Sequence, residues 1–122
     1  MVEVKKQNPE IAREYCEQFG IEYITGETEL ISAKDGSKTI GNCVFDLTEE
    51  KITIKFIEPE KEADSMLRSA LFIAANKGIM EAFYKEPVKS DLISRLGFVK
   101  NLTDCSIDIT NLFLNCENCK KR

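Results

Sequence analysis

Histidine and tryptophan are absent from this chain of 122 residues. Without histidine there is no imidazole general base, no Ser-His or Cys-His nucleophile pair, and no histidine ligand for zinc. Hydrolases that depend on a catalytic triad with histidine are therefore nearly excluded.

Excess positive charge and long apolar runs are also missing. The 17 Lys and Arg against 21 Asp and Glu give a formal net charge of -4, and no window holds a dense basic cluster that would neutralise several phosphates. No apolar run approaches the roughly 20 residues that span a bilayer, and the first residues lack the apolar stretch of a secretion signal. We therefore expect a cytoplasmic protein that binds neither nucleic acid nor membrane.

The five cysteines do not form a disulfide pattern, because their number is odd and Cys16, Cys43 and Cys105 stand singly in apolar segments. In such places a free thiol packs as a small hydrophobe, which favours a reducing compartment. The Cys116-x-x-Cys119 pair is half of a zinc or redox site, but the other half is not evident. A tail that carries two thiols is the favoured interpretation, and a metal or thiol protein stays open as an alternative.

The composition that is present, 43% hydrophobic and 31% charged residues, is typical of one compact domain. We expect this domain at residues 1–114, followed by a polar tail that contains cysteine at residues 115–122. No internal repeat or linker interrupts it.

The first half of the chain predicts one helix and several strands. Asn8 and Pro9 form a helix start, the apolar residues that follow recur at helical spacing, and Gly20 suits the helix end. A short edge strand precedes it at residues 2–4. The period then changes to about two, which predicts antiparallel strands at residues 30–33, 38–47 and 51–57. The segment 21–29 is either a loop or a second short helix.

The second half begins where Pro59 ends the third of these strands, after which Asp64 or Ser65 can cap a long helix that stops at Gly78. A strand at residues 79–84, a short helix from Ser90 to Leu96 and two strands at residues 98–99 and 105–109 follow. The order β-α-βββ-α-β-α-ββ predicts an α+β domain with a mixed, largely antiparallel central sheet.

This order, with Phe56-Ile57-Glu58-Pro59 before the long helix and Leu96-Gly97-Phe98 after the short one, resembles the GNAT acetyltransferase superfamily over residues 28–110. The resemblance implies a three-layer α/β/α fold, acetyl-CoA as cofactor and transfer of an acetyl group to an amine. In the family, backbone amides at the start of the long helix hold the pyrophosphate, since unpaired N–H groups and the helix dipole favour anions.

Residue by residue, the resemblance places the cofactor at two stretches of this chain, and the position of a carboxylate at the end of a strand suggests a general base. The strand backbone at Phe56 and Ile57 would meet the pantetheine arm, and Glu58 is the candidate base. The pyrophosphate would lie at the helix start, formed by Ala63, Asp64, Ser65 and Met66. No metal ligand is implied.

Two family features are replaced in this chain. The pyrophosphate loop reads Glu62-Ala63-Asp64-Ser65, with neither of the family's glycines and with Glu62 where a basic or amide residue is usual. The position of the family's tyrosine, the general acid for the departing thiolate, is Ile93, which has no proton to give. A binding or interaction module without CoA chemistry, dimeric through its sheet edges, is therefore the alternative to a transferase.

Overall fold

The computed structural model describes residues 2–110. The boundary expected at residue 114 and the tail expected at residues 115–122, with Cys116 and Cys119, lie outside the described residues.

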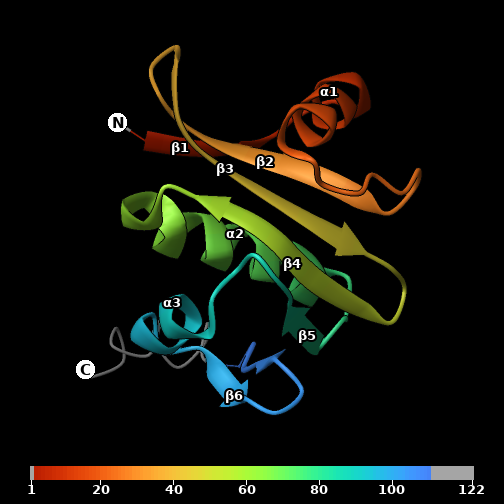
Figure 1. Ribbon diagram of the computed structural model, residues 1–122, viewed down its shortest axis with the longest axis vertical. Coiled ribbons are helices and arrows are strands. Elements are labelled where there is room, and N and C mark those ends of the chain that lie inside the picture. Colours follow the sequence, from red (N-terminus) through yellow and green to blue (C-terminus); the bar gives the residue numbers. More distant parts are fainter. Residues whose placement is uncertain (1, 111–122) are drawn as a thin grey trace.

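A seven-stranded sheet forms the centre of this part of the molecule (Figure 1), in the order β1-β2-β3-β4-β5-β7-β6. Only β4 and β5 pair in parallel, so the sheet is mixed and largely antiparallel, as predicted. The strands are β1 Val2–Lys6, β2 Thr28–Asp35, β3 Lys38–Leu47, β4 Lys51–Glu58, β5 Glu81–Tyr84, β6 Val99–Asn101 and β7 Ser106–Ile107.

Helices cover both faces of the sheet, which confirms the α+β class and the three layers. Because side chains alternate along a strand, Leu30 and Val44 point to α1 (Pro9–Phe19), whereas Ile31 and Cys43 join the core that contains α2. Helices α2 (Ala63–Asn76) and α3 (Ser90–Arg95) both contribute to that second core. None of the helices in residues 2–110 is long and apolar enough to cross a membrane.

Helix α1 begins and ends where the sequence predicts. The Asn8 side chain accepts a hydrogen bond from the Ile11 amide at 2.9 Å, and Pro9 occupies the first turn. Gly20 follows the helix at φ 69°, a left-handed conformation that glycine adopts without steric cost. Its amide donates to the carbonyl of Cys16, which satisfies one of the free carbonyls at the helix end.

The predicted start of α2 is wrong. The helix begins at Ala63, directly after a 3-10 turn at Glu60–Glu62, so neither Asp64 nor Ser65 is the capping residue. Main-chain carbonyls replace the side-chain cap, because the Glu62 amide donates to Pro59 and the Ala63 amide donates to Glu60. Ser65 instead donates its hydroxyl to the carbonyl of Glu62 at 3.3 Å.

Other element boundaries differ from the prediction for reasons of pairing. β2 is longer than expected because its first residue, Thr28, already pairs with Asp46 of β3. β5 is shorter because the Ile79 amide donates to Ala74 and stays with the end of α2. β7 is short because Cys105, just before it, has a positive φ of 56° that does not fit a strand. Segment 21–27 forms a loop with a turn and no second helix.

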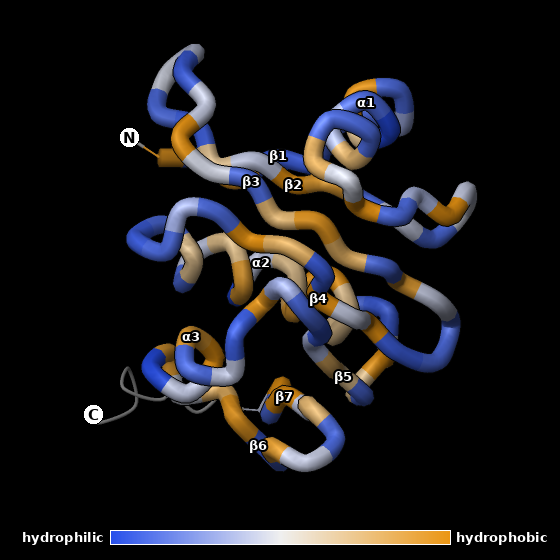
Figure 2. Tube along the Cα trace, in the orientation of Figure 1, coloured by the Kyte–Doolittle hydropathy of each residue, from blue (hydrophilic) through white to orange (hydrophobic). Residues whose placement is uncertain are grey.

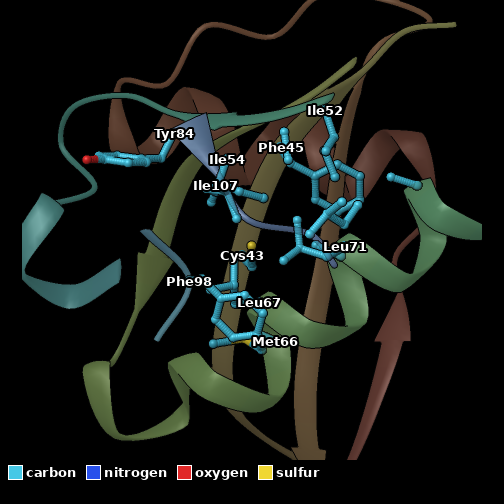
Figure 3. Packing of buried hydrophobic residues seen from close by; sticks show 14 of the residues in the cluster. Cys43, Phe45, Ile52, Ile54, Met66, Leu67, Leu71, Tyr84, Phe98 and Ile107 are labelled. Carbon is cyan, nitrogen blue, oxygen red and sulfur yellow. The ribbon is translucent and has the colours of Figure 1, made fainter. Parts of the chain in front are cut away.

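The hydropathy of the chain follows these layers: apolar residues mark the central strands, and hydrophilic residues mark the turns between them (Figure 2). The labelled core side chains come from α2, from strands of the sheet that it covers, and from Phe98 just before β6 (Figure 3). Fully buried members of this core include Cys43, Phe45, Ile54, Met66 and Phe98. The sheet and α2 therefore pack on one shared core, and β4, a strand of that sheet, leads from this core to Glu58.

Candidate active site

The candidate site begins where β4 and β5 part. Their parallel pairing ends at Ile54 and Tyr84, and one further bond joins the Lys85 amide to the Ile54 carbonyl. β4 continues to Glu58, while the chain after β5 turns away into the loop before α3. Within residues 2–110, the last three residues of β4 thus have a strand partner on the β3 side only, which leaves their main-chain groups on the other side free for a ligand.

A bulge lies at the point where the strands part. Val44 of β3 pairs with Phe56, and the next residue, Phe45, pairs with Ile54, so Lys55 is an extra residue in β4. Such a bulge bends its strand and redirects side chains. Here it turns Lys55 toward the α1 side of the sheet, the side that Phe56 also faces.

Lys55 is 2% exposed, and its charge is compensated by a buried polar cluster. Its ammonium lies 2.9 Å from the Asp46 carboxylate and donates to the Glu22 carbonyl at 2.6 Å. Thr28 donates its hydroxyl to the same Asp46 carboxylate at 2.6 Å. The cluster ties β2, β3, β4 and the α1–β2 loop together directly under the parting strands.

A cavity of about 320 Å³, the cleft cavity, opens beside this bulge. One wall is aromatic, since the rings of Phe19 and Phe56 lie 5.6 Å apart. The opposite wall is the segment 85–87 after β5, and the rest comes from the end of α1 and the residues that follow it. The whole lining is Phe19, Gly20, Ile21, Glu22, Lys55, Phe56, Lys85, Glu86 and Pro87.

Glu58, the predicted base, is half-buried at the end of β4 and is held by α1. Its carboxylate accepts a hydrogen bond from the Tyr15 hydroxyl. The Tyr15 ring in turn packs on Phe19, with ring centres 4.6 Å apart, and on Phe56 at 6.0 Å. The carboxylate is therefore oriented toward the α1 side of β4, two residues beyond the cleft cavity.

The polar groups around this carboxylate continue across the sheet. Asn42 of β3 lies opposite Glu58, and Ser32 of β2 lies opposite Asn42 and donates its hydroxyl to the Asn42 side chain at 2.7 Å. Burial, followed by the hydrogen bond and the charge of Glu58, raises the pKa of the Tyr15 hydroxyl, whereas Asn42 lowers it. Tyr15 therefore stays protonated at neutral pH and keeps donating to Glu58.

The two predicted pantetheine residues lie on the free stretch of β4. Phe56 packs on the α1 side, whereas Ile57 packs partly against the core under α2. Because consecutive side chains of a strand alternate, these two point to opposite faces, so both leave the strand edge itself to main-chain atoms. A ligand arm in the cleft would therefore meet backbone groups here.

The predicted pyrophosphate residues form the first turn of α2, and only main-chain groups and two exposed side chains are accessible there. Ala63 and Met66 are fully buried under the helix. Asp64 is exposed and pairs with Arg68 at 3.0 Å, and Ser65 is exposed. Because the preceding 3-10 turn already uses the Ala63 amide, fewer free amides face solvent here than a glycine loop would offer.

Acidic side chains dominate the same corner. Glu60 binds Arg95 of α3 at 2.8 Å, and Arg95 also lies 3.4 Å from Asp91. Ile93, at the position of the family's tyrosine, is fully buried in the core. The β4 edge thus offers main-chain groups to a ligand arm, whereas at the α2 start the two arginines, Arg68 and Arg95, are already paired with carboxylates.

Sequence reasoning missed Lys55 and Tyr15, which the structure brings to the two ends of the free β4 stretch. In the sequence, Lys55 occupies a solvent-facing position of an alternating strand pattern. The bulge that buries it depends on the pairing of β4 with β3. Tyr15 reads as part of the apolar stripe of α1. The hydroxyl of Tyr15 within that apolar stripe was the only sequence signal that this residue has a polar partner such as Glu58.

Similar solved structures identify the fold of this chain. A GNAT family acetyltransferase from Elizabethkingia anophelis with acetyl-CoA bound matches 82% of this chain and 77% of its own, at TM-score 0.58 and 17% identity. The chain has the GNAT acetyltransferase fold. The ribosomal-protein-S18-alanine N-acetyltransferase from Escherichia coli shares this GNAT fold over 83% and 79% of the two chains, at TM-score 0.60 and 10% identity.

A third similar structure is a chain of a KacTA–DNA complex, with TM-score 0.58, 9% identity and coverage of 97% of this chain and 99% of that one. No protein-family model matches the present chain, and no curated protein matches it by sequence. At these identities the likeness shows the fold. The expectation that nucleic acid is not a partner stays a prediction from net charge.

In residues 2–110, no group of three or more acidic or cysteine side chains is placed to hold a metal ion. Cys16 and Cys43 are free and buried, and burial raises the pKa of both thiols. Cys105 is free and half-buried, so it is less enclosed than the apolar pattern predicted. The alternative in which Cys116 and Cys119 form a metal or thiol site concerns residues outside the described part of the chain.

Proposed function

We propose that this protein is an N-acetyltransferase that uses acetyl-CoA and a small-molecule or peptide amine, with Glu58 as general base. The observation that carries the proposal is the free stretch of β4 beside the cleft cavity, with a carboxylate fixed at its end by Tyr15. The likeness to acetyltransferase structures, one of them with acetyl-CoA bound, supports it.

In the proposed reaction, acetyl-CoA supplies the acetyl group as an activated thioester. The main-chain groups of β4 at Phe56 and Ile57 orient the thioester and polarise its carbonyl. The amine nitrogen attacks the carbonyl carbon, the C–S bond breaks, and Glu58 accepts the proton that the nitrogen loses. The thiolate takes its proton from water, because Ile93 has none to give.

Thermal unfolding of the reduced protein with and without acetyl-CoA tests the cofactor part of this proposal. A ligand that binds only the folded state raises the melting temperature by mass action. We expect a rise with millimolar acetyl-CoA. Acetyl-CoA should give a larger rise than S-acetylpantetheine, which has the same arm without the nucleotide. No rise with either compound would contradict acetyl-CoA binding.

The variant Glu58→Gln tests the base. We expect it to bind acetyl-CoA as the wild type does, because Gln keeps the size of the side chain and can still accept a hydrogen bond from Tyr15. Acetyl-CoA consumption with a panel of primary amines should fall about 100-fold or more. An unchanged rate would remove Glu58 from the mechanism without affecting the cofactor assignment.

A second candidate function is an interaction module without CoA chemistry. It is favoured by the acidic α2 start, where Glu60 and Asp64 already hold Arg95 and Arg68. In this proposal the protein works as a dimer through a sheet edge. Sedimentation would then show a dimer, and acetyl-CoA would leave the melting temperature unchanged.

A further inference from the structure

A second hollow, the loop hollow, lies between the loop after β5 and the β6–β7 hairpin. Its volume of about 670 Å³ lies within the range of sites for small molecules. Segment 85–87 also lines the cleft cavity, but no residue of α1 or β4 lines the loop hollow. Its lining consists of Tyr84, Lys85, Glu86, Pro87, Val88, Lys89, Ser90, Asp91, Leu102 and Cys105.

Tyr84 brings a polar atom to the floor of this hollow. The residue is 4% exposed, and within residues 2–110 its hydroxyl has no hydrogen-bond partner. Figure 3 shows that this hydroxyl points away from the labelled core side chains, toward the loop after β5. A buried hydroxyl without a partner costs free energy, which a ligand with a matching group would recover.

Two further polar side chains converge on the same hydroxyl. Cys105 has a φ of 56°, a conformation that residues other than glycine rarely adopt, and this places its thiol near Tyr84. Burial, then Cys105, raises the pKa of Tyr84, whereas Ser90 lowers it. The phenol therefore remains protonated at neutral pH, and Cys105 and Ser90 are the polar side chains that a ligand would meet beside it.

The remaining walls define the chemistry of a ligand. Val88 is buried, Pro87 is exposed, and Leu102 is 60% exposed at the rim, so the contact surface is largely apolar. Among the lining residues, two lysines and two carboxylates have equal and opposite formal charges, so the lining itself favours neither an anion nor a cation. These charges belong to Lys85, Lys89, Glu86 and Asp91.

We propose that the loop hollow is a second binding site, for a small, uncharged, mostly apolar molecule with a carbonyl oxygen that accepts a hydrogen bond from Tyr84. The site does not depend on acetyl transfer. Its ligand would contact segment 85–87 from the side opposite to the aromatic wall of the cleft cavity.

Three probes of similar size separate the alternatives by NMR with the full-length, reduced, 15N-labelled protein. Benzamide is uncharged and has a carbonyl, benzoate is an anion, and benzylamine is a cation without a carbonyl. We expect millimolar benzamide to shift the amide signals of residues 84–91 and 102–105, and the two charged probes to bind several-fold more weakly. No shift with benzamide, or tighter binding of a charged probe, overturns the proposal.

The variant Tyr84→Phe removes one oxygen and leaves the walls in place. Because the hydroxyl makes no hydrogen bond of normal geometry within residues 2–110, we expect an unchanged or slightly higher melting temperature and about fivefold weaker benzamide binding. Equal binding by this variant overturns the role of Tyr84. If the variant unfolds, the hydroxyl has a partner inside the protein, and the proposal fails as well.

The variant Leu102→Ser supplies a second test at the exposed rim, where a polar residue leaves the core untouched. It should weaken benzamide binding through lost apolar contact and preserve the melting temperature. Benzamide binding that neither variant changes would place the probe elsewhere on the protein and overturn the assignment.

Discussion

Lys55 illustrates how a single buried charge holds several elements of this fold together. Its ammonium contacts the Asp46 carboxylate and the Glu22 carbonyl, and Thr28 lies 3.4 Å away. A buried ion pair gains little over an apolar pair, because desolvation offsets the attraction. Loss of one partner is costly, since it leaves the other charge buried and unpaired.

The variant Lys55→Met should therefore be less stable than the wild type by about 3–5 kcal/mol in urea unfolding. The double variant Asp46→Asn, Lys55→Met removes both charges and should recover part of this loss. If the loss of stability in the double variant equals the sum of the losses in Lys55→Met and Asp46→Asn alone, the two residues do not act as a unit.

Because of Tyr15, the stability of the protein changes with pH in the alkaline range. Its ordinary pKa is 10.0, and the folded state raises this pKa through burial and the neighbouring Glu58. Above about pH 10, the unfolded chain therefore loses this proton while the folded chain keeps it. The stabilisation is complete below that pH and declines as the pH rises further.

Urea unfolding between pH 9 and pH 11.5 measures this decline. Tyr15 should make the free energy of unfolding decline more steeply above pH 10, by less than the limiting slope of one proton, because the residue is only half-buried and solvent screens its contact with Glu58. The variant Tyr15→Phe lacks the group and should show a shallower decline, whereas exposed residues titrate equally in both proteins. Identical slopes would mean that the Tyr15 hydroxyl is not enclosed against Glu58.

At the scale of elements, the close approach of α2 to β3 depends on Gly41. A Cβ atom at this position would lie 3.0 Å from the end of Met66, 3.1 Å from Cβ of Glu62 and 3.2 Å from the carbonyl oxygen of Glu58. The Met66 side chain can move, but the Glu58 carbonyl belongs to the backbone of β4. Gly41 therefore sets the distance between the α2 start and the end of β4, where both parts of the candidate site lie.

The variant Gly41→Ala should lose about 1–3 kcal/mol of stability, because the added methyl group overpacks this junction. Thr39→Ala, at an exposed position of the same strand, is the matched control and should change stability by less than about 0.5 kcal/mol. Urea unfolding measures both variants. Equal stability of the two would contradict the close contact between α2 and β3.

At the scale of the whole molecule, the sheet is unevenly protected. β3 is paired on both sides, and Cys43, Val44 and Phe45 are fully buried. β6 contains three residues and β7 contains two, and β6 is an edge strand of the sheet. Local opening should therefore be easiest at the β6–β7 hairpin, which lines the loop hollow.

Amide hydrogen exchange tests this gradient. We expect residues 43–45 to exchange at least about two orders of magnitude more slowly than residues 99–107. A ligand in the loop hollow should slow exchange in the hairpin and leave β3 unchanged. Uniform exchange across the sheet would mean that the hairpin opens only when the whole domain unfolds.

The sequence by itself determined the number, type and order of the elements, because these follow from local signals. Asn8, Pro9 and Gly20 delimit α1, and changes of hydrophobic period separate helices from strands. Boundaries were less accurate where pairing decides them, as at Thr28, or where main-chain bonds replace a side-chain cap, as at the start of α2.

Only the tertiary structure decided how the candidate site is assembled. The sequence placed Glu58 at a strand end, but its contact with Tyr15 joins residues 43 positions apart. The burial of Lys55 depends on a one-residue shift in the pairing of β3 with β4, which alternation within β4 cannot reveal. Local patterns record the period of a segment, whereas bulges, parting strands and buried charge pairs arise from neighbours that are distant in the chain.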